Sequence, residues 1–164
     1  MYDAPEVHEG MALVWARVFL MTNKQVGVPD DDVTAVIVLR HGAIPIAMND
    51  ELWAKYNFGK MFKVDDAKTK APSTRNFFRV WEDFMLPECG VEPLQKSGVL
   101  FGVCDMALTV FSSAAAKEMK MDPAECKKEW VAGLLPGIQI VPSGVLAVNR
   151  TQEHGCTYCF AGGE

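Results

Sequence analysis

The sequence contains no apolar run long enough to cross a membrane, because its most apolar stretches are interrupted by Arg17 and by Asp105. It is also short of positive charge: 16 Lys and Arg residues are scattered among 21 Asp and Glu residues, and the net charge is −5. Such a chain lacks the basic surface that binds nucleic acid or an anionic membrane. We therefore predict that the protein binds neither nucleic acid nor a membrane.

Cysteine is too scarce and too scattered for a secreted disulfide framework. The 164 residues contain five cysteines, an odd number, whereas small secreted domains carry dense, paired cysteines. This usage favours a reducing compartment, and no export signal is visible at the N-terminus. We expect a cytoplasmic protein, with the periplasm as the alternative if an export signal has been removed.

Motifs of several enzyme classes are missing as well. There is no G-x-S-x-G elbow, no Ser/His/Asp signature and no glycine-rich loop of the kind that cradles phosphate, so hydrolase and nucleotide-binding functions have no motif support. We expect no cofactor. No repeat, low-complexity segment or linker divides the chain, and 49% of its residues are hydrophobic. Residues 1–164 are therefore predicted to form a single domain.

The most informative stretch runs from Gly98 to Ala116. Its apolar run from Val99 to Val103 is typical of a strand buried on both faces of a parallel sheet. The strand ends at Cys104, and Asp105 is expected to cap a helix that follows directly. The positive end of that helix favours a reactive thiolate at Cys104, whereas the Asp105 carboxylate and burial oppose it. The alternative is an inert, buried cysteine.

Strands and helices alternate along the whole chain. Asp3 to Glu6 reads as the loop after a first strand, so the chain is expected to begin just after, or within, that strand. Further strands are expected at Thr34 to Leu39, Ile138 to Val141 and Cys156 to Phe160. Helices are expected to begin near Met11, Asn49, Asp122 and Ser143, an amphipathic helix from Trp81 is expected to end at Gly90, and Asn57 to Pro72 reads as a loop. This alternation predicts an α/β domain with a mostly parallel sheet and helices on both faces.

Three polar segments follow the carboxyl ends of predicted strands, which is where α/β sheets bind their ligands. They contribute the side chains of Arg40, His41, Cys104 and Ser143. An arginine binds oxyanions and a histidine exchanges a proton near neutral pH, so together they suit an anionic or thiolate-bearing group. The alternatives are a salt bridge for Arg40 and a hydrogen-bonded loop histidine for His41.

Cys156 and Cys159 form a C-x-x-C motif near the C-terminus. This spacing can close a disulfide or supply half of a zinc site. No second C-x-x-C supplies the other two ligands, and residues three apart on a strand point to opposite faces, so we predict no metal site. A redox pair remains an alternative for these two cysteines.

Four segments resemble the DsrE/DsrF-like sulfur-relay superfamily, and in particular its branch of stand-alone, largely uncharacterised proteins. They are VIVLRHGAIPIAMNDELWAKY, Arg75-Asn76-Phe77, GVLFGVCDMAL and LLPGIQIVPSGVLAVNRTQEHG. The resemblance implies a three-layer α/β/α sandwich around a parallel five-stranded sheet with a truncated first strand. It also implies trimers or hexamers with a crevice near the subunit contacts. In sulfur-relay members a cysteine ending a central strand carries persulfide sulfur between partner proteins, and Cys104 matches that position.

Our leading hypothesis is a homo-oligomeric sulfur-transfer protein whose catalytic thiol, Cys104, exchanges sulfane sulfur with a donor or acceptor protein. Arg40 and His41 would stabilise the charged species. Further residues expected to line the crevice are Trp53, Arg75, Asn76 and Ser143. Two alternatives stay open: a non-catalytic module that binds a small ligand or a partner, and a thiol–disulfide switch formed by Cys156 and Cys159.

Overall fold

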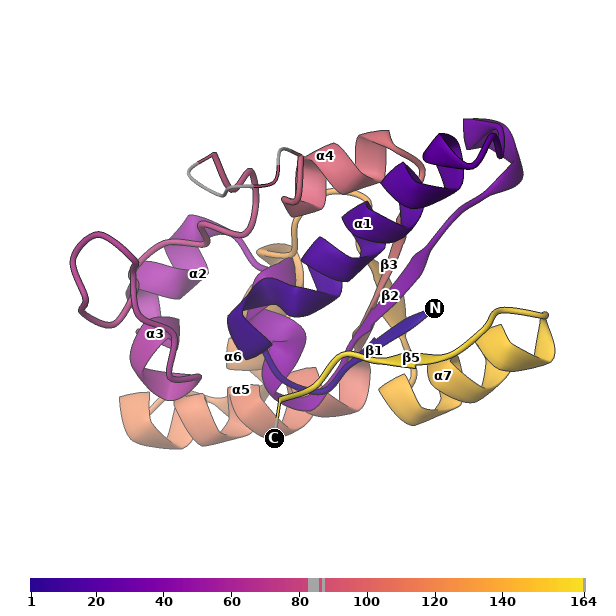
Figure 1. The fold of residues 1–164 in the computed structure, drawn as a ribbon. Coiled ribbons are helices and arrows are strands. Elements are labelled where there is room, and N and C mark those ends of the chain that lie inside the picture. The colour runs from indigo at the N-terminus through magenta and orange to yellow at the C-terminus, as the bar shows by residue number, and fades with distance from the viewer. Residues whose placement is uncertain (83–85, 87, 164) are drawn as a thin grey trace.

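A single parallel sheet forms the centre of the protein. The computed structural model describes residues 1–82, 86 and 88–163. In this part of the chain the strands are β1 (Tyr2–Ala4), β2 (Val36–Leu39), β3 (Leu100–Cys104), β4 (Gln139–Val141) and β5 (Cys159–Phe160). Their order is β4-β3-β2-β1-β5, and all neighbours pair in parallel (Figure 1). Because the strands are parallel, all of their carboxyl ends meet at one edge of the sheet.

Helices cover both faces of this sheet, which confirms the predicted three-layer α/β sandwich. Helix α1 (Met11–Gln25) packs on β1 and β2, and α4 (Val91–Lys96) packs beside α1. Helix α7 (Gly144–Glu153) packs on β2 and β3 from the other face of the sheet (Figure 1). Strands β1 to β4 lie next to one another in sequence order, so each step moves the same way across the sheet. After β4, the chain crosses back to the opposite edge, where β5 pairs with β1. Right-handed crossovers then require α7 to lie on the opposite face from α1.

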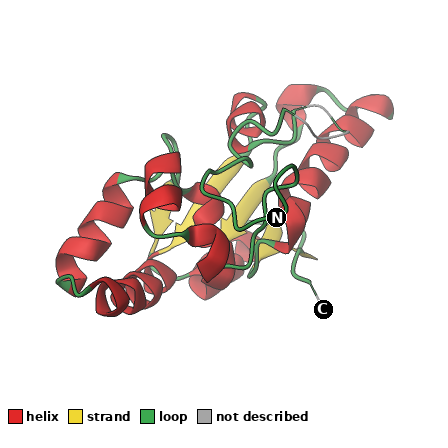
Figure 2. Cartoon of the chain, turned by 90° about the vertical axis from the view of Figure 1, so that its left-hand side faces the viewer, coloured by secondary structure: helices red, strands yellow, loops and turns green. Residues whose placement is uncertain are grey.

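The remaining helices gather where the strands point. They are α2 (Asp50–Lys55), α3 (Phe58–Met61), α5 (Asp105–Met119), α6 (Pro123–Ala132), and the short 3-10 helices η1 (His8–Gly10) and η3 (His41–Ala47). The 3-10 helix η2 (Asp30–Asp32) instead precedes β2 and lies at the opposite edge of the sheet. Figure 2 looks from the side of α2 and α3 and shows helices and loops in front of the strands. In that region Phe58 and Trp130 are fully buried with ring centroids 4.8 Å apart. An aromatic core therefore supports the carboxyl edge of the sheet.

Two of the helix starts that the sequence predicts are confirmed by side-chain caps. The Asn49 side chain accepts the N–H of Leu52 at 3.0 Å at the start of α2. Before α6, Asp122 Oδ1 accepts the N–H groups of Ala124 and Glu125 at 2.9 and 3.1 Å. Each cap satisfies backbone donors that the first turn of a helix leaves unpaired.

Two local predictions need correction. The segment expected to be a loop from Asn57 begins with the short helix α3. Gly90 does not end a helix but precedes α4, with an extended backbone. It lies so close to Val80 that a Cβ would come within 2.6 Å of the Val80 carbonyl oxygen. The rest of that expected helix, residues 83–85 and 87, lies outside the described residues.

No helix in the described part of the chain is long and apolar enough to span a membrane. The expectation that Asp3 and Ala4 belong to the loop after the first strand is wrong, because both residues lie within β1 and Asp3 pairs with Val38 of β2. This register places the carboxyl end of β1 beside the carboxyl end of β2.

Gly59 offers a test of this packing. A Cβ on Gly59 would lie 2.2 Å from the Ser73 amide nitrogen and 2.4 Å from the Ser73 carbonyl oxygen. Because backbone cannot yield as a side chain can, we expect Gly59→Ala to lower the free energy of unfolding by roughly 3 kcal/mol or more. Urea denaturation followed by circular dichroism measures the loss.

Gly155→Ala is the matched control. Gly155 has a φ of +87° but nothing within 4 Å of its missing Cβ, so only the left-handed backbone is penalised. This variant should lose about 1–2 kcal/mol. Equal losses in the two variants would contradict the close packing of α3 against Ser73.

Candidate functional site

A buried ion pair joins the carboxyl ends of β1 and β2. Arg40 follows β2 directly, and its Nε donates to Asp3 Oδ1 at 2.6 Å while its Nη2 donates to Oδ2 at 3.0 Å. Asp3 is only 3% exposed. The hydrogen bond that Arg40 donates to Asp3 raises the pKa of the Arg40 guanidinium above its ordinary value. The two-point contact fixes the guanidinium in one orientation at the edge of the sheet.

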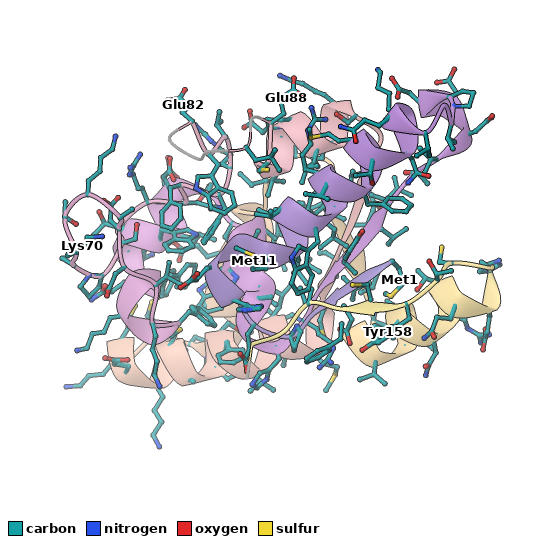
Figure 3. The ribbon with its side chains drawn as sticks, viewed as in Figure 1. Met1, Met11, Lys70, Glu82, Glu88 and Tyr158 are labelled. Atoms are coloured by element: carbon teal, nitrogen blue, oxygen red, sulfur yellow. The ribbon has the colours of Figure 1, made fainter. Side chains whose placement is uncertain are left out.

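Tyr158, from the segment that leads into β5, completes this pair. Its hydroxyl donates to Asp3 Oδ2 at 2.9 Å. Burial, followed by the hydrogen bond to Asp3, raises the pKa of Tyr158. Figure 3 labels Tyr158 beside Met1, where β5 pairs with β1. Sequence analysis missed both Asp3 and Tyr158, and the only available signal was an acidic residue inside an apolar strand.

The start of α7 lies directly on Arg40. A Cβ on Gly144 would come within 2.4 Å of the Arg40 Cβ, so only glycine permits this approach. The preceding residue, Ser143, caps α7 by accepting the Leu146 N–H at 3.1 Å. The structure therefore brings Ser143 close to Arg40, as expected, but its hydroxyl oxygen is engaged by the helix.

Cys104 ends β3 and caps α5 itself. Its Sγ accepts the N–H of Ala107 at 3.4 Å. The residue is 6% exposed. Leu39 pairs with Val103 in the sheet, so Arg40 and Cys104, the residues that follow them, are neighbours at the carboxyl ends of β2 and β3. Arg40, Cys104 and the first turns of α5 and α7 thus form one cluster, which we call the thiol site.

The expectation that Asp105 caps α5 is wrong. Asp105 is the first residue of the helix, and its carboxylate pairs with Lys127 of α6 at 2.8 Å. This ion pair offsets the negative charge that would otherwise oppose a thiolate at Cys104.

His41 does not take part in the thiol site. Its ring packs edge-on against Phe111 of α5, with centroids 5.4 Å apart. Within the described part of the chain, no hydrogen bond or ion pair joins His41 to Cys104. His41 has a φ of +47°, and this left-handed backbone accompanies the turn from β2 into η3, which takes its side chain toward Phe111.

Trp53 and Asn76 lie inside the protein, where they support η3. Trp53 is fully buried, and its indole N–H donates to the Pro45 carbonyl oxygen at 2.9 Å. Asn76 is 3% exposed, and its amide donates to the carbonyl oxygens of Ile46 and Met48 at 2.9 and 2.7 Å. Their polar groups are therefore used in holding the fold.

Arg75 lies at the surface and pairs with Asp66 at 3.2 Å. The backbone N–H groups of Lys68 and Thr69 also bind Asp66 and lower the pKa of its carboxyl group. The ion pair between Arg75 and Asp66 holds the segment that follows α3 in place. Arg75 therefore has a structural role, although its side chain is partly exposed.

A groove lies next to the thiol site, with a volume of about 1120 Å³. His41, Arg75 and Asn76 are among its lining residues, whereas Cys104 and Arg40 are not. Met11 and Glu82, labelled in Figure 3, also line it. Because partly buried aromatic rings form much of its wall, we call it the aromatic groove. The residues predicted to share one crevice are thus separated. The thiol site contains Arg40, Cys104 and Ser143, the aromatic groove is lined by His41, Arg75 and Asn76, and Trp53 lies in the core.

Cys156 and Cys159 are half-buried free thiols. Only Cys159 belongs to β5, whereas the Cys156 N–H donates to Thr151 at the end of α7. The alternation of faces along a strand therefore does not extend to Cys156. Among the described residues, no group of three or more His, Cys, Asp or Glu side chains is placed to hold a metal ion.

Comparison with known protein-family models found no match for this chain, and no curated protein matches it either. The functional proposal therefore rests on the geometry of the thiol site.

Proposed function

We propose that the protein is a sulfane-sulfur carrier and that Cys104 is the residue that accepts the sulfur. The observation that supports this proposal is that the Cys104 sulfur accepts the Ala107 N–H at the start of α5, while Arg40 follows the neighbouring strand at the adjacent register position. Both groups stabilise an anion, and a hydrogen bond to an ionised acceptor is roughly twice as strong as one to a neutral acceptor. A thiolate and a persulfide anion both gain from this environment.

The transfer is a thiol exchange without net oxidation. The Cys104 thiolate attacks the outer sulfur of a donor persulfide, R–S–SH, so that a new S–S bond forms at Cys104. The donor S–S bond breaks, and RS⁻ leaves with the proton of the new persulfide, so that RSH is released and Cys104 is left as the persulfide anion. An acceptor thiolate later attacks the outer sulfur of the Cys104 persulfide and releases the Cys104 thiolate. Arg40 faces a negative charge before and after each step.

Burial limits the donor. Cys104 is 6% exposed, so a large reagent reaches its sulfur only after a local opening of the site. A small anionic donor fits better, because Arg40 attracts it. A reducing compartment such as the cytoplasm suits this chemistry, since it keeps all five cysteines of the chain available as thiols.

The carrier is proposed to act as a homo-oligomer, a trimer or a hexamer. Exposed apolar side chains support this part of the proposal: Met106 and Val110 lie one turn apart on α5 and are 57% and 60% exposed. Val145, at the start of α7, is 64% exposed. These residues belong to the two helices that begin at the thiol site, so a subunit contact there would shelter the persulfide from water.

The first test maps the sulfur. The reduced protein is incubated with inorganic polysulfide, digested with trypsin and examined by mass spectrometry. Residues 97–117 form a tryptic peptide with Cys104 as its only cysteine, and Cys89, Cys126 and the Cys156–Cys159 pair fall on three other peptides. We expect the gain of one sulfur atom on peptide 97–117, because Arg40 attracts the anionic donor to Cys104.

Cys104→Ser should abolish this gain, whereas Cys156→Ser should keep it. A bulky maleimide provides the opposite selectivity, since it should label the half-buried Cys156 and Cys159 first. Sulfur that appears only on the C-terminal peptide, or nowhere, would refute the carrier.

The second test removes the charge beside the sulfur. Arg40→Gln is combined with Asp3→Asn, so that no unpaired charge stays buried. We expect sulfur gain at Cys104 to become roughly tenfold slower, the loss that corresponds to about 1.4 kcal/mol of transition-state stabilisation. The measurement is the time course of modification of peptide 97–117, with near-ultraviolet circular dichroism as a check that the variant is folded. An unchanged rate in a folded variant would show that Arg40 has no part in the transfer.

The third test concerns assembly. Light scattering of the wild-type protein should give the mass of a trimer or a hexamer. Met106→Glu combined with Val110→Glu should lower that mass, because two carboxylates in an apolar contact are costly to bury. Val26→Glu is the control, since Val26 is 79% exposed at the far end of α1. A monomeric wild-type protein would rule out the oligomer.

A further inference from the structure

The aromatic groove is separate from the thiol site and has the features of a ligand site of its own. It is formed by the turn after β1, the start of η3, the segment after α3, residues 75–82 and Phe111 of α5. Its volume of about 1120 Å³ is large enough for a small organic molecule. The proposed sulfur chemistry at Cys104 makes no use of this space.

One wall of the groove presents aromatic rings. Phe111 lies 5.1 Å from Phe62 and 5.4 Å from the His41 ring, measured between centroids, and each of the three remains partly exposed. Phe77 and Trp81, also partly exposed, line the groove with ring centroids 6.4 Å apart. The face of an aromatic ring carries partial negative charge and attracts cations.

The charged groups around the groove favour a cation as well. Both arginines that line it are engaged by carboxylates: Arg75 pairs with Asp66 at 3.2 Å, and Arg79 pairs with Glu92 at 3.5 Å. Four lining carboxylates have no ion-pair or hydrogen-bond partner among the described residues: Glu6, Glu9, Asp65 and Glu82. Two lysines that also line the groove, Lys63 and Lys68, offset only part of this negative charge.

An unsatisfied imidazole nitrogen lies in the same groove. Nδ1 of His8 is buried and has no hydrogen-bond partner among the described residues, while its ring packs edge-on against Trp15 at 6.1 Å. A buried acceptor without a donor is costly, roughly 1–3 kcal/mol. Nδ1 accepts an N–H bond in the tautomer that carries its proton on Nε2, and a protonated amine in the groove would supply that bond after a small rotation of the His8 ring.

The backbone around the groove is unusually strained. Nine non-glycine residues of the described chain have positive φ, and five of them line the groove: His8, Glu9, His41, Lys63 and Trp81. Such conformations cost about 1–3 kcal/mol each and gather at ligand-binding and active sites.

We propose that the aromatic groove binds a small organic cation, an aromatic ring that carries a protonated amine. The ring stacks against Phe111 and its neighbours, and the ammonium group lies among the unpaired carboxylates and His8. Charge complementarity selects the cation over an anion with the same ring. This site goes beyond sulfur transfer and does not depend on it.

The experiment compares two probes with the same ring and opposite charge. Tryptamine and indole-3-acetate are titrated into the full chain at pH 7 by isothermal calorimetry. We expect tryptamine to bind at least about tenfold more tightly, which corresponds to about 1.4 kcal/mol. Chemical-shift changes on titration with tryptamine should map to His41, Lys63 and Phe111.

Glu9→Gln combined with Glu82→Gln should weaken tryptamine binding at least about threefold, since it removes two of the unpaired charges at exposed positions. Glu118→Gln, on the exposed side of α5 and outside the groove, is the matched control and should change nothing. Cys104→Ser should bind tryptamine as the wild-type protein does, so this test and the sulfur test fail independently. Equal binding of the two probes, no binding of tryptamine at millimolar concentration, or an unaffected double variant would each overturn the proposal.

Discussion

The ion pair between Asp3 and Arg40 is the interaction on which the thiol site depends. A carboxylate that is 3% exposed requires a partner, because an unpaired buried charge costs several kcal/mol. Arg40 supplies that partner through two hydrogen bonds, and the same contact fixes the guanidinium at the carboxyl ends of the central strands. The arginine that Asp3 needs for stability is therefore also the residue next to Cys104 at the ends of the paired strands β2 and β3.

Neighbouring elements keep this pair in place from three sides. Tyr158 donates to Asp3 Oδ2, the oxygen that also accepts from Arg40 Nη2, and this bond ties the C-terminal strand to the site. Gly144 lets the start of α7 approach the Arg40 side chain, and Cys104 begins α5 without an intervening loop. Two helices thus direct their first turns toward one cation and one sulfur, and the dipoles of these turns favour negative charge there.

The sequence predicts the local elements well because their causes are local. The β-branched run before Leu39 and the caps at Asn49, Asp122 and Ser143 lie within a few residues of what they determine. Long-range pairings carry no such signal. Asp3 and Arg40 are 37 positions apart and Asp3 and Tyr158 are 155 apart, so only the order of the strands brings them together.

The sequence predicts only part of the candidate site, because contacts between distant segments leave no local signal. The ends of β2 and β3 were placed correctly, and Arg40 does lie beside Cys104. The sequence does not show in which direction each side chain points. In the structure His41 packs against Phe111, and Trp53 and Asn76 point inward and support η3. Polar residues after a strand therefore indicate where a site lies, but packing decides which of them face it.

The central claim, that a fixed cation lies beside the Cys104 sulfur, is tested most directly by alkylation with a charged and a neutral reagent of nearly equal size. The rates of reaction with iodoacetate and iodoacetamide are measured at Cys104 and, as an internal reference, at Cys156 of the same protein. Arg40 should attract the anionic reagent, so the ratio of the iodoacetate rate to the iodoacetamide rate should be higher at Cys104 than at Cys156. A ratio at Cys104 equal to or below that at Cys156 would contradict the account.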